Sequence, residues 1–177
     1  MYLRSDWSPS PEDLALLEQY LTAEERELFE RMDPPDRQHS FKVANLCARS
    51  LDNFPDANRD EIMKAALLHD VGKIGANLDL GFRTCWVLSH KVVPWLMDWL
   101  SLHSEHSRPG TFRHKMWLQR THAHAGAQVL RELGVAETVC KMVEATATRR
   151  EPGDPLDWQI IKAADGDVVL APGDEKG

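Results

Sequence analysis

Apolar residues recur every three or four positions along nearly the whole chain, and no stretch alternates between apolar and polar residues as a half-buried strand does. The pattern predicts helices throughout and therefore an all-α fold. Two short helices are expected after the capping residues Ser10 and Thr22, each of which is followed three positions later by an acidic residue. Further helices are predicted over residues 37–51, from 58 to the glycines at 72 and 75, over 81–102 with a break or kink at Pro94, over 115–134, over 136–148 and over 156–170.

The length of 177 residues is that of one ordinary domain, or at most of one domain with a small extra arm. Proline-rich and glycine-rich breaks divide the chain further. We predict an N-terminal helical arm over residues 1–36, one main domain over residues 37–171 and a polar tail over residues 172–177.

Charge and cysteine content narrow the class of protein. The formal net charge is -7, which argues against a duplex-DNA-binding or membrane-surface protein, because such proteins usually carry a basic surface. The three cysteines Cys47, Cys85 and Cys140 are odd in number and show no C-x-x-C spacing, and the first residues include no apolar segment of signal-peptide length. A cytoplasmic protein with reduced thiols is therefore expected. The apolar stretch over residues 85–102 contains charged residues and a proline, so it is interpreted as a buried or partly buried helix and not as a membrane span.

Three polar side chains fall on the apolar faces of predicted helices. His39, His69 and Asp165 each lie three, four or seven positions from apolar residues of the same helix. Asp70 follows His69 directly, whereas Asp167 is two positions beyond Asp165 and is expected to face solvent. A buried carboxylate needs a partner. Helical domains build metal sites from imidazoles and carboxylates that converge from separate helices. The spacing alone predicts either a metal site or a buried hydrogen-bond network.

These residues resemble the H…HD…D signature of the HD-domain superfamily of metal-dependent phosphohydrolases. Residues 37–44 resemble the first helix of that family, in which the histidine is followed by an apolar Val-Ala pair. Residues 65–74 are close to the HDIGK form of the central motif, and residues 162–165 resemble the xxAD of the last helix. The resemblance extends from about residue 37 to residue 170 and implies a single-domain, HD-type helical bundle.

The HDIGK form, as in the HD-GYP phosphodiesterases, often has further histidines for a second metal ion. One of these is the histidine of an H-P-x-x-G segment. His122 lies four positions before Gly126 and matches that histidine, although this chain has no proline after it, and His122 is preferred to His124 as a ligand. The His-His pair expected next is missing from residues 143–150, and so is a GYP motif. In HD nucleotidases that use one metal, the position three after the aspartate is usually acidic, whereas here it is Lys73. The chain therefore fits neither subgroup completely.

The resemblance implies a metal site formed by His39, His69, Asp70 and Asp165, with His122 as a ligand of a second ion. A mixed nitrogen and oxygen donor set favours Mn, Fe, Co, Ni or Zn over Mg, as one or two ions. Such an ion lowers the pKa of a bound water from 15.7 towards about 7, so that hydroxide can attack a phosphate ester. Asp70 is expected to orient that nucleophile.

Two basic residues are candidates for contact with the substrate. Lys73, one turn beyond Asp70, is expected either to contact a substrate phosphate or the scissile oxygen, or to be a helix-end lysine that faces the dipole. Arg149 is either a phosphate ligand or a solvated residue at a helix end.

The expected function is that of a phosphohydrolase whose partner is a small phosphorylated substrate, such as a nucleotide. The alternatives are an HD-fold protein that binds metal in a signalling or structural role, and a structural helical domain with buried polar pairs. Residues 78–115 make a region longer than a minimal HD core requires, and we expect it to cap the site or to form a contact in a homodimer.

Overall fold

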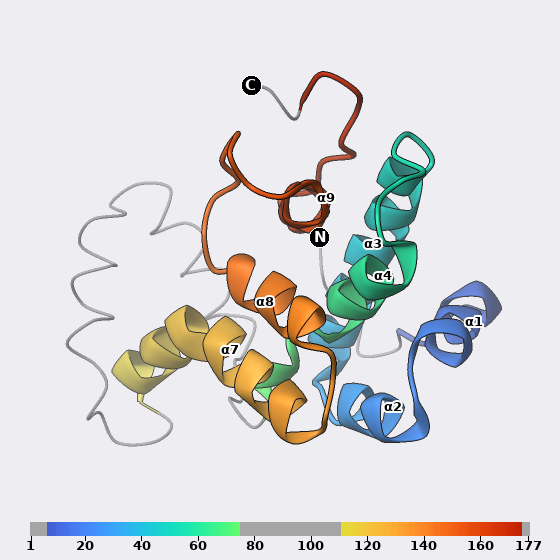
Figure 1. The fold of residues 1–177 in the computed structure, drawn as a ribbon. Helices are drawn as coiled ribbons and strands as arrows, with labels where there is room; N and C mark the ends of the chain where they lie inside the picture. Colours follow the sequence, from blue (N-terminus) through green and yellow to red (C-terminus); the bar gives the residue numbers. More distant parts are fainter. Residues whose placement is uncertain (1–6, 75–110, 175–177) are drawn as a thin grey trace.

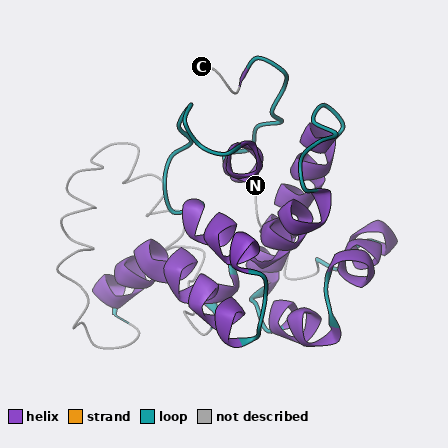
Figure 2. Cartoon of the chain, in the orientation of Figure 1, coloured by secondary structure: helices purple, strands orange, loops and turns teal. Residues whose placement is uncertain are grey.

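A computed structural model of the protein describes residues 7–74 and 111–174, and within them the chain forms helices and no strand (Figure 1, Figure 2). The prediction of an all-α fold is confirmed. The elements are α1 (Pro11–Tyr20), α2 (Ala23–Glu30), α3 (Pro34–Leu51), α4 (Arg59–Leu68), the short 3-10 helix η1 (Val71–Lys73), α7 (Phe112–Glu132), α8 (Glu137–Ala145) and α9 (Leu156–Asp165). The predicted helix over residues 81–102 and most of the region 78–115 lie outside the described residues.

The first two helices begin where the sequence pattern places them. The Ser10 hydroxyl accepts a hydrogen bond from the Asp13 amide, and the Asp13 carboxylate accepts one from the Ser10 amide. Thr22 and Glu25 form the same reciprocal capping box at the start of α2. These bonds satisfy amide groups that a helix start otherwise leaves without partners.

Several helix boundaries differ from the prediction: α4 ends at Leu68, before the glycines, α7 begins at Phe112, and α8 ends at Ala145. Helix α3 begins at Pro34, three residues earlier than expected, because prolines are tolerated in a first turn, where the amide has no intrahelical acceptor. Helix α9 ends at Asp165, five residues earlier than expected. Gly166 follows it, and Asp167 takes a left-handed conformation with φ of 66°, which cannot continue a right-handed helix.

Helix α4 runs through the centre of the bundle and is packed against α3, α8 and α9 (Figure 1). Its residues Ile62, Met63 and 65–68 are fully buried. Helices α1 and α2 also pack on α4, and their apolar residues belong to the same buried cluster. The centre of the molecule is therefore the later part of α4, which is apolar apart from Lys64 and ends directly before His69. No helix in the described part of the chain has the length and apolar character needed to cross a bilayer.

A buried lysine fastens the loop between α8 and α9. The Lys162 ammonium donates hydrogen bonds to the Thr148 hydroxyl (2.9 Å), the Arg149 carbonyl (3.2 Å) and the Asp154 carboxylate (2.9 Å). It also lies 5.7 Å from the centre of the Trp158 ring. All of its donors have partners, so the loop is held against the first turns of α9.

Replacing Lys162 by methionine is expected to lower the free energy of unfolding by about 2 kcal/mol, because the partly buried Asp154 carboxylate loses a charged donor. Urea denaturation of both proteins measures the change. Lys141→Met, at an exposed position on α8, is the matched control and should stay within about 0.5 kcal/mol of wild type. Equal stability of the two variants would show that the Lys162 contacts contribute little.

Candidate metal centre

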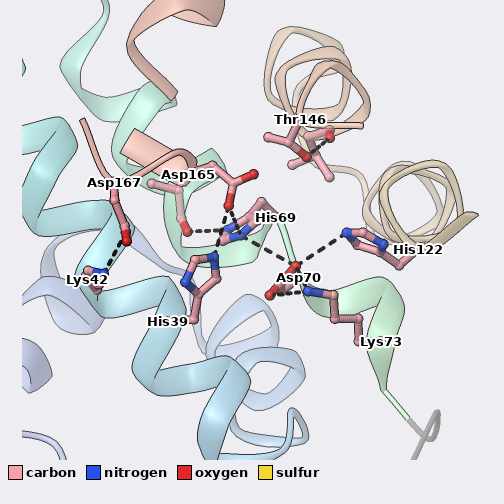
Figure 3. Close-up of polar contacts among 11 residues, drawn as sticks. His39, Lys42, His69, Asp70, Lys73, His122, Thr146, Asp165 and Asp167 are labelled. Atoms are coloured by element: carbon pink, nitrogen blue, oxygen red, sulfur yellow. Dashed lines mark hydrogen bonds and ion pairs between the residues drawn. The ribbon is translucent and has the colours of Figure 1, made fainter. Parts of the chain in front are cut away.

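Three side chains from three helices meet at one end of α4. His39 comes from the second turn of α3, His69 is the C-cap of α4, and Asp165 is the last residue of α9 (Figure 3). Their donor atoms all lie within 4.8 Å of one another. His39 Nε2 is 2.9 Å from Asp165 Oδ1, and His69 Nε2 is 3.6 Å from the same oxygen. The packing of α3 and α9 against α4 therefore creates a compact group of two imidazoles and a carboxylate.

His69 is the most constrained member of this group. Its side chain is 2% exposed, and its Nδ1–H donates a hydrogen bond of 2.9 Å to the Ala66 carbonyl. This bond places a proton on Nδ1, so that Nε2 carries a lone pair when the imidazole is neutral. Nε2 is fully buried, makes no hydrogen bond, and faces the Oδ1 atoms of Asp70 and Asp165 at 3.5 and 3.6 Å. A buried lone pair directed at two carboxylate oxygens is unfavourable unless a proton or a metal cation lies between them.

Asp70 lies beside this group and is neutralised by a lysine. Its side chain is 1% exposed, and the Lys73 ammonium is 2.7 Å from Oδ1 and 2.8 Å from Oδ2. Burial by itself would raise the pKa of Asp70, but His69, Lys73 and His122 hold that pKa well below its usual range. The carboxylate is therefore ionised. The contact of Lys73 with Asp70 is one that the sequence analysis did not predict.

Two glycines bring α7 against η1 and place His122 beside Asp70. A Cβ atom added at Gly72 would overlap the His122 carbonyl oxygen and would lie 2.7 Å from the Gly126 amide nitrogen. Only a residue without a side chain allows the two backbones to approach so closely. The result is that His122 Nε2 lies 3.5 Å from Asp70 Oδ1. The sequence analysis used Gly126 to align His122 but did not identify the contact with Gly72.

The other candidate residues lie outside this centre. His124 is 78% exposed, and its Nδ1 is 3.1 Å from the Glu144 carboxylate. Arg149 is exposed in the loop after α8, and within the described residues no contact joins its side chain to the site. Asp167 is 61% exposed, as expected from its spacing, and forms an ion pair with Lys42 (Figure 3).

The position of the missing His-His pair is occupied by the end of α8. Thr146 is the C-cap of that helix and is drawn near the site in Figure 3. Its hydroxyl donates a hydrogen bond of 2.7 Å to the Val143 carbonyl, one turn earlier. The segment therefore presents a short hydroxyl side chain that is already bonded to its own helix.

The electrostatics of the group suit a cation. Burial would lower the pKa of His39, but the hydrogen bond to Asp165 and the charge of Asp70 raise it overall. Burial would raise the pKa of Asp165, but the bond from His39 and the neighbouring His69 lower it. The negative charges of Asp70 and Asp165 thus favour a positive charge at His39. Neutral imidazole nitrogens and carboxylate oxygens form the mixed donor set that first-row transition metals accept, so the residues present fit such an ion.

Comparison with known proteins gives one match. Residues 37–93 match the family model described as "HD domain". The matched segment contains His39, His69, Asp70 and Lys73, whereas His122 and Asp165 lie beyond it. No curated protein and no solved structure matches the chain significantly.

Proposed function

We propose, from the match of residues 37–93 to the HD-domain family model, that the chain is a metal-dependent phosphohydrolase. The substrate would be a nucleotide or a related phosphomonoester or phosphodiester, and the nucleophile a metal-activated water. The HD domain supports membership of a metal-dependent hydrolase superfamily. The substrate, the reaction and the residues that perform it are our proposal.

One observation carries the proposal. His69 Nε2 is buried without a hydrogen bond, while its other ring nitrogen is bonded to Ala66. A structural histidine in a core would use both nitrogens or expose one of them to water. An imidazole oriented through a backbone carbonyl, with the opposite nitrogen free, is the arrangement of histidine ligands of metals. A buried hydrogen-bond network, the alternative from spacing alone, would leave this nitrogen unexplained.

The side chains have distinct roles in this proposal. His39, His69 and Asp165 would hold a divalent transition metal, with Asp70 at its edge and His122 on the far side of Asp70. When bound, the ion supplies Lewis acidity to water and to a phosphoryl oxygen. Asp70 would accept a hydrogen bond from the attacking water and so orient it. Lys73 keeps Asp70 ionised and adds positive charge where a phosphate would lie.

The alternative is an HD-fold protein that binds metal in a signalling or structural role. The observation in its favour is that Lys73 contacts both oxygens of Asp70. The carboxylate that would orient the attacking water is therefore already paired. The remaining inferences rest on the sequence alone: a cytoplasmic location, a small phosphorylated partner and no duplex DNA or membrane partner, with residues 78–115 either capping the site or forming a homodimer contact.

Metal content and hydrolysis of the purified protein test the proposal together. We expect a transition metal by elemental analysis, reduced to a tenth or less in His69→Ala and retained in His124→Ala, the exposed matched control. Hydrolysis of p-nitrophenyl phosphate, its bis-ester and nucleoside phosphates should fall about 1,000-fold in His69→Ala, in line with loss of a catalytic metal. Circular dichroism confirms that each variant is folded.

The two measurements separate the hypotheses. Metal that is lost in His69→Ala, without turnover of any phosphoester, would favour the non-catalytic alternative. A protein that neither contains nor takes up a transition metal would contradict the proposal altogether.

A further inference from the structure

Two side-chain contacts join α3 to the end of α9, and the second lies beside the metal centre. His39 Nε2 is 2.9 Å from Asp165 Oδ1, and Lys42 Nζ is 2.6 Å from Asp167 Oδ1 (Figure 3). His39 and Lys42 are three residues apart on α3, so they share one side of that helix. The Lys42–Asp167 ion pair is therefore about one helical turn along α3 from a candidate metal ligand.

Asp167 occupies a position at which glycine is usual. Its amide donates a hydrogen bond of 3.0 Å to the Ala164 carbonyl. The Val168 amide donates one of 2.8 Å to the Ala163 carbonyl, which completes a Schellman motif at the end of α9. The left-handed residue of this motif is most often glycine, but here it is Asp167, with φ of 66°. This conformation is unfavourable for a residue with a side chain, and a negative charge is unfavourable at the C-terminal end of a helix.

A gain in stability does not account for this aspartate. The Lys42 and Asp167 side chains are 42% and 61% exposed, and an ion pair so open to water contributes little to stability. Within residues 7–74 and 111–174, Asp167 is the one residue other than glycine that has a positive φ. Costly local conformations that bring no gain in stability are concentrated at functional sites. We therefore looked for a role of the pair in binding.

The charge of Lys42 can reach a bound molecule more readily than that of Lys73. Lys73 is 11% exposed and contacts both oxygens of the buried Asp70 carboxylate. The carboxylate that Lys42 contacts belongs to Asp167 and is itself largely exposed, so another anion can take its place. The protein as a whole carries a net charge of -7 and repels phosphorylated molecules, and a lysine beside the metal centre offsets this repulsion locally.

From these contacts we propose that Lys42 binds a second phosphate group of the substrate, which replaces Asp167 as the partner of the ammonium. The reacting phosphate ester would lie at the metal centre. The inference rests on the proposed function and narrows its substrate class to phosphomonoesters that carry a second phosphate. Lysine suits this role, because a compact charge on a flexible side chain can follow either anion. In the free protein, Asp167 keeps the ammonium beside the site.

The test compares adenosine 3′,5′-bisphosphate with adenosine 5′-monophosphate. Hydrolysis gives kcat and KM, and calorimetric titration of the Mn²⁺-loaded protein gives Kd if neither compound is hydrolysed. For wild type we expect a KM or Kd about tenfold lower for the bisphosphate, a preference that declines as ionic strength rises. Lys42→Gln should raise that constant about tenfold for the bisphosphate, leave kcat unchanged and leave the monophosphate within about twofold.

Two further variants test the exchange of partners. Lys42→Arg keeps the charge and should retain the preference for the bisphosphate. Asp167→Asn should lower the KM or Kd for the bisphosphate severalfold, because the second phosphate no longer competes with a carboxylate for Lys42. Lys141→Gln, at an exposed position on α8, is the matched control and should leave every constant within about twofold of wild type.

The outcomes separate this inference from the proposed function. Hydrolysis without a preference for the bisphosphate, or with a preference that Lys42→Gln retains, would overturn the inference and leave the proposed function standing. A preference in binding that depends on Lys42, without hydrolysis of either compound, would support the phosphate contact and remove the proposed function. Binding of neither compound to the Mn²⁺-loaded protein would remove both.

Discussion

Replacing Asp165 by asparagine is expected to weaken metal binding by about 100-fold or more and to abolish phosphoester hydrolysis. The substitution keeps the size of the side chain and leaves an oxygen that can accept the hydrogen bond from His39. It removes the negative charge at the point where His39 and His69 converge. Loss of a group that only supports a ligand already reduces metal affinity 10–100-fold, so loss of an anionic ligand should exceed that range. Titration of the metal-free protein with Mn²⁺ measures the effect.

Asp167→Asn is the control for this change. It removes the same charge two residues further along the chain, from a side chain that is paired with Lys42 at the surface. Because an exposed ion pair contributes little, metal affinity and stability should remain close to those of wild type. If both variants lose affinity equally, the effect of Asp165 is one of general charge and not of coordination.

The second large effect is expected at Gly72. Alanine there would place a methyl group against the backbone of α7 at His122 and Gly126. Backbone atoms of a packed helix cannot move aside as a flexible side chain can, so we expect a loss of about 3 kcal/mol in the free energy of unfolding. For a chain of this size, such a loss lowers the melting temperature by about 6–12 °C. Thermal unfolding followed by circular dichroism measures this.

Gly153→Ala provides the comparison. A Cβ atom at Gly153 would have no neighbour within 4 Å, so the same substitution should leave the melting temperature within about 2 °C of wild type. A Gly72→Ala protein as stable as Gly153→Ala would mean that α7 and η1 can move apart without a loss of stability. The position of His122 would then need another explanation.

Much of the helical architecture follows from local signals in the sequence. The capping residues Ser10 and Thr22 mark the starts of α1 and α2 because side-chain oxygens at those positions satisfy helix amides. The start of α3 was misplaced because Pro34 and Pro35 end one helix as readily as they begin the next. The early end of α9 depends on Gly166 and on the left-handed conformation of Asp167, which an aspartate adopts only in a suitable context.

Only part of the site could be predicted from the sequence. Helical spacing identified His39, His69 and Asp165 as inward-facing, and the structure brings these three together. The spacing of three residues between Asp70 and Lys73 allows a contact but does not require one, since the same lysine on a regular helix could extend into solvent. The approach of Gly72 to Gly126 joins residues 54 positions apart, and no local pattern encodes a contact over that separation.

The contacts of the segment after Asp165 affect the order in which the chain would fold and bind a metal ion. The Leu170 amide donates a hydrogen bond to the Ser50 hydroxyl, and the Leu170 carbonyl accepts one from the Asn53 side chain. These bonds connect the chain beyond α9 to the C-terminal end of α3. Contacts outside the site therefore help to fix the relative position of the two helices that carry Asp165 and His39. Folding would then not require the proposed metal ion, unlike in small domains that fold only around their ion. The ligands would be preorganised, and the ion would exchange with its surroundings without unfolding the chain.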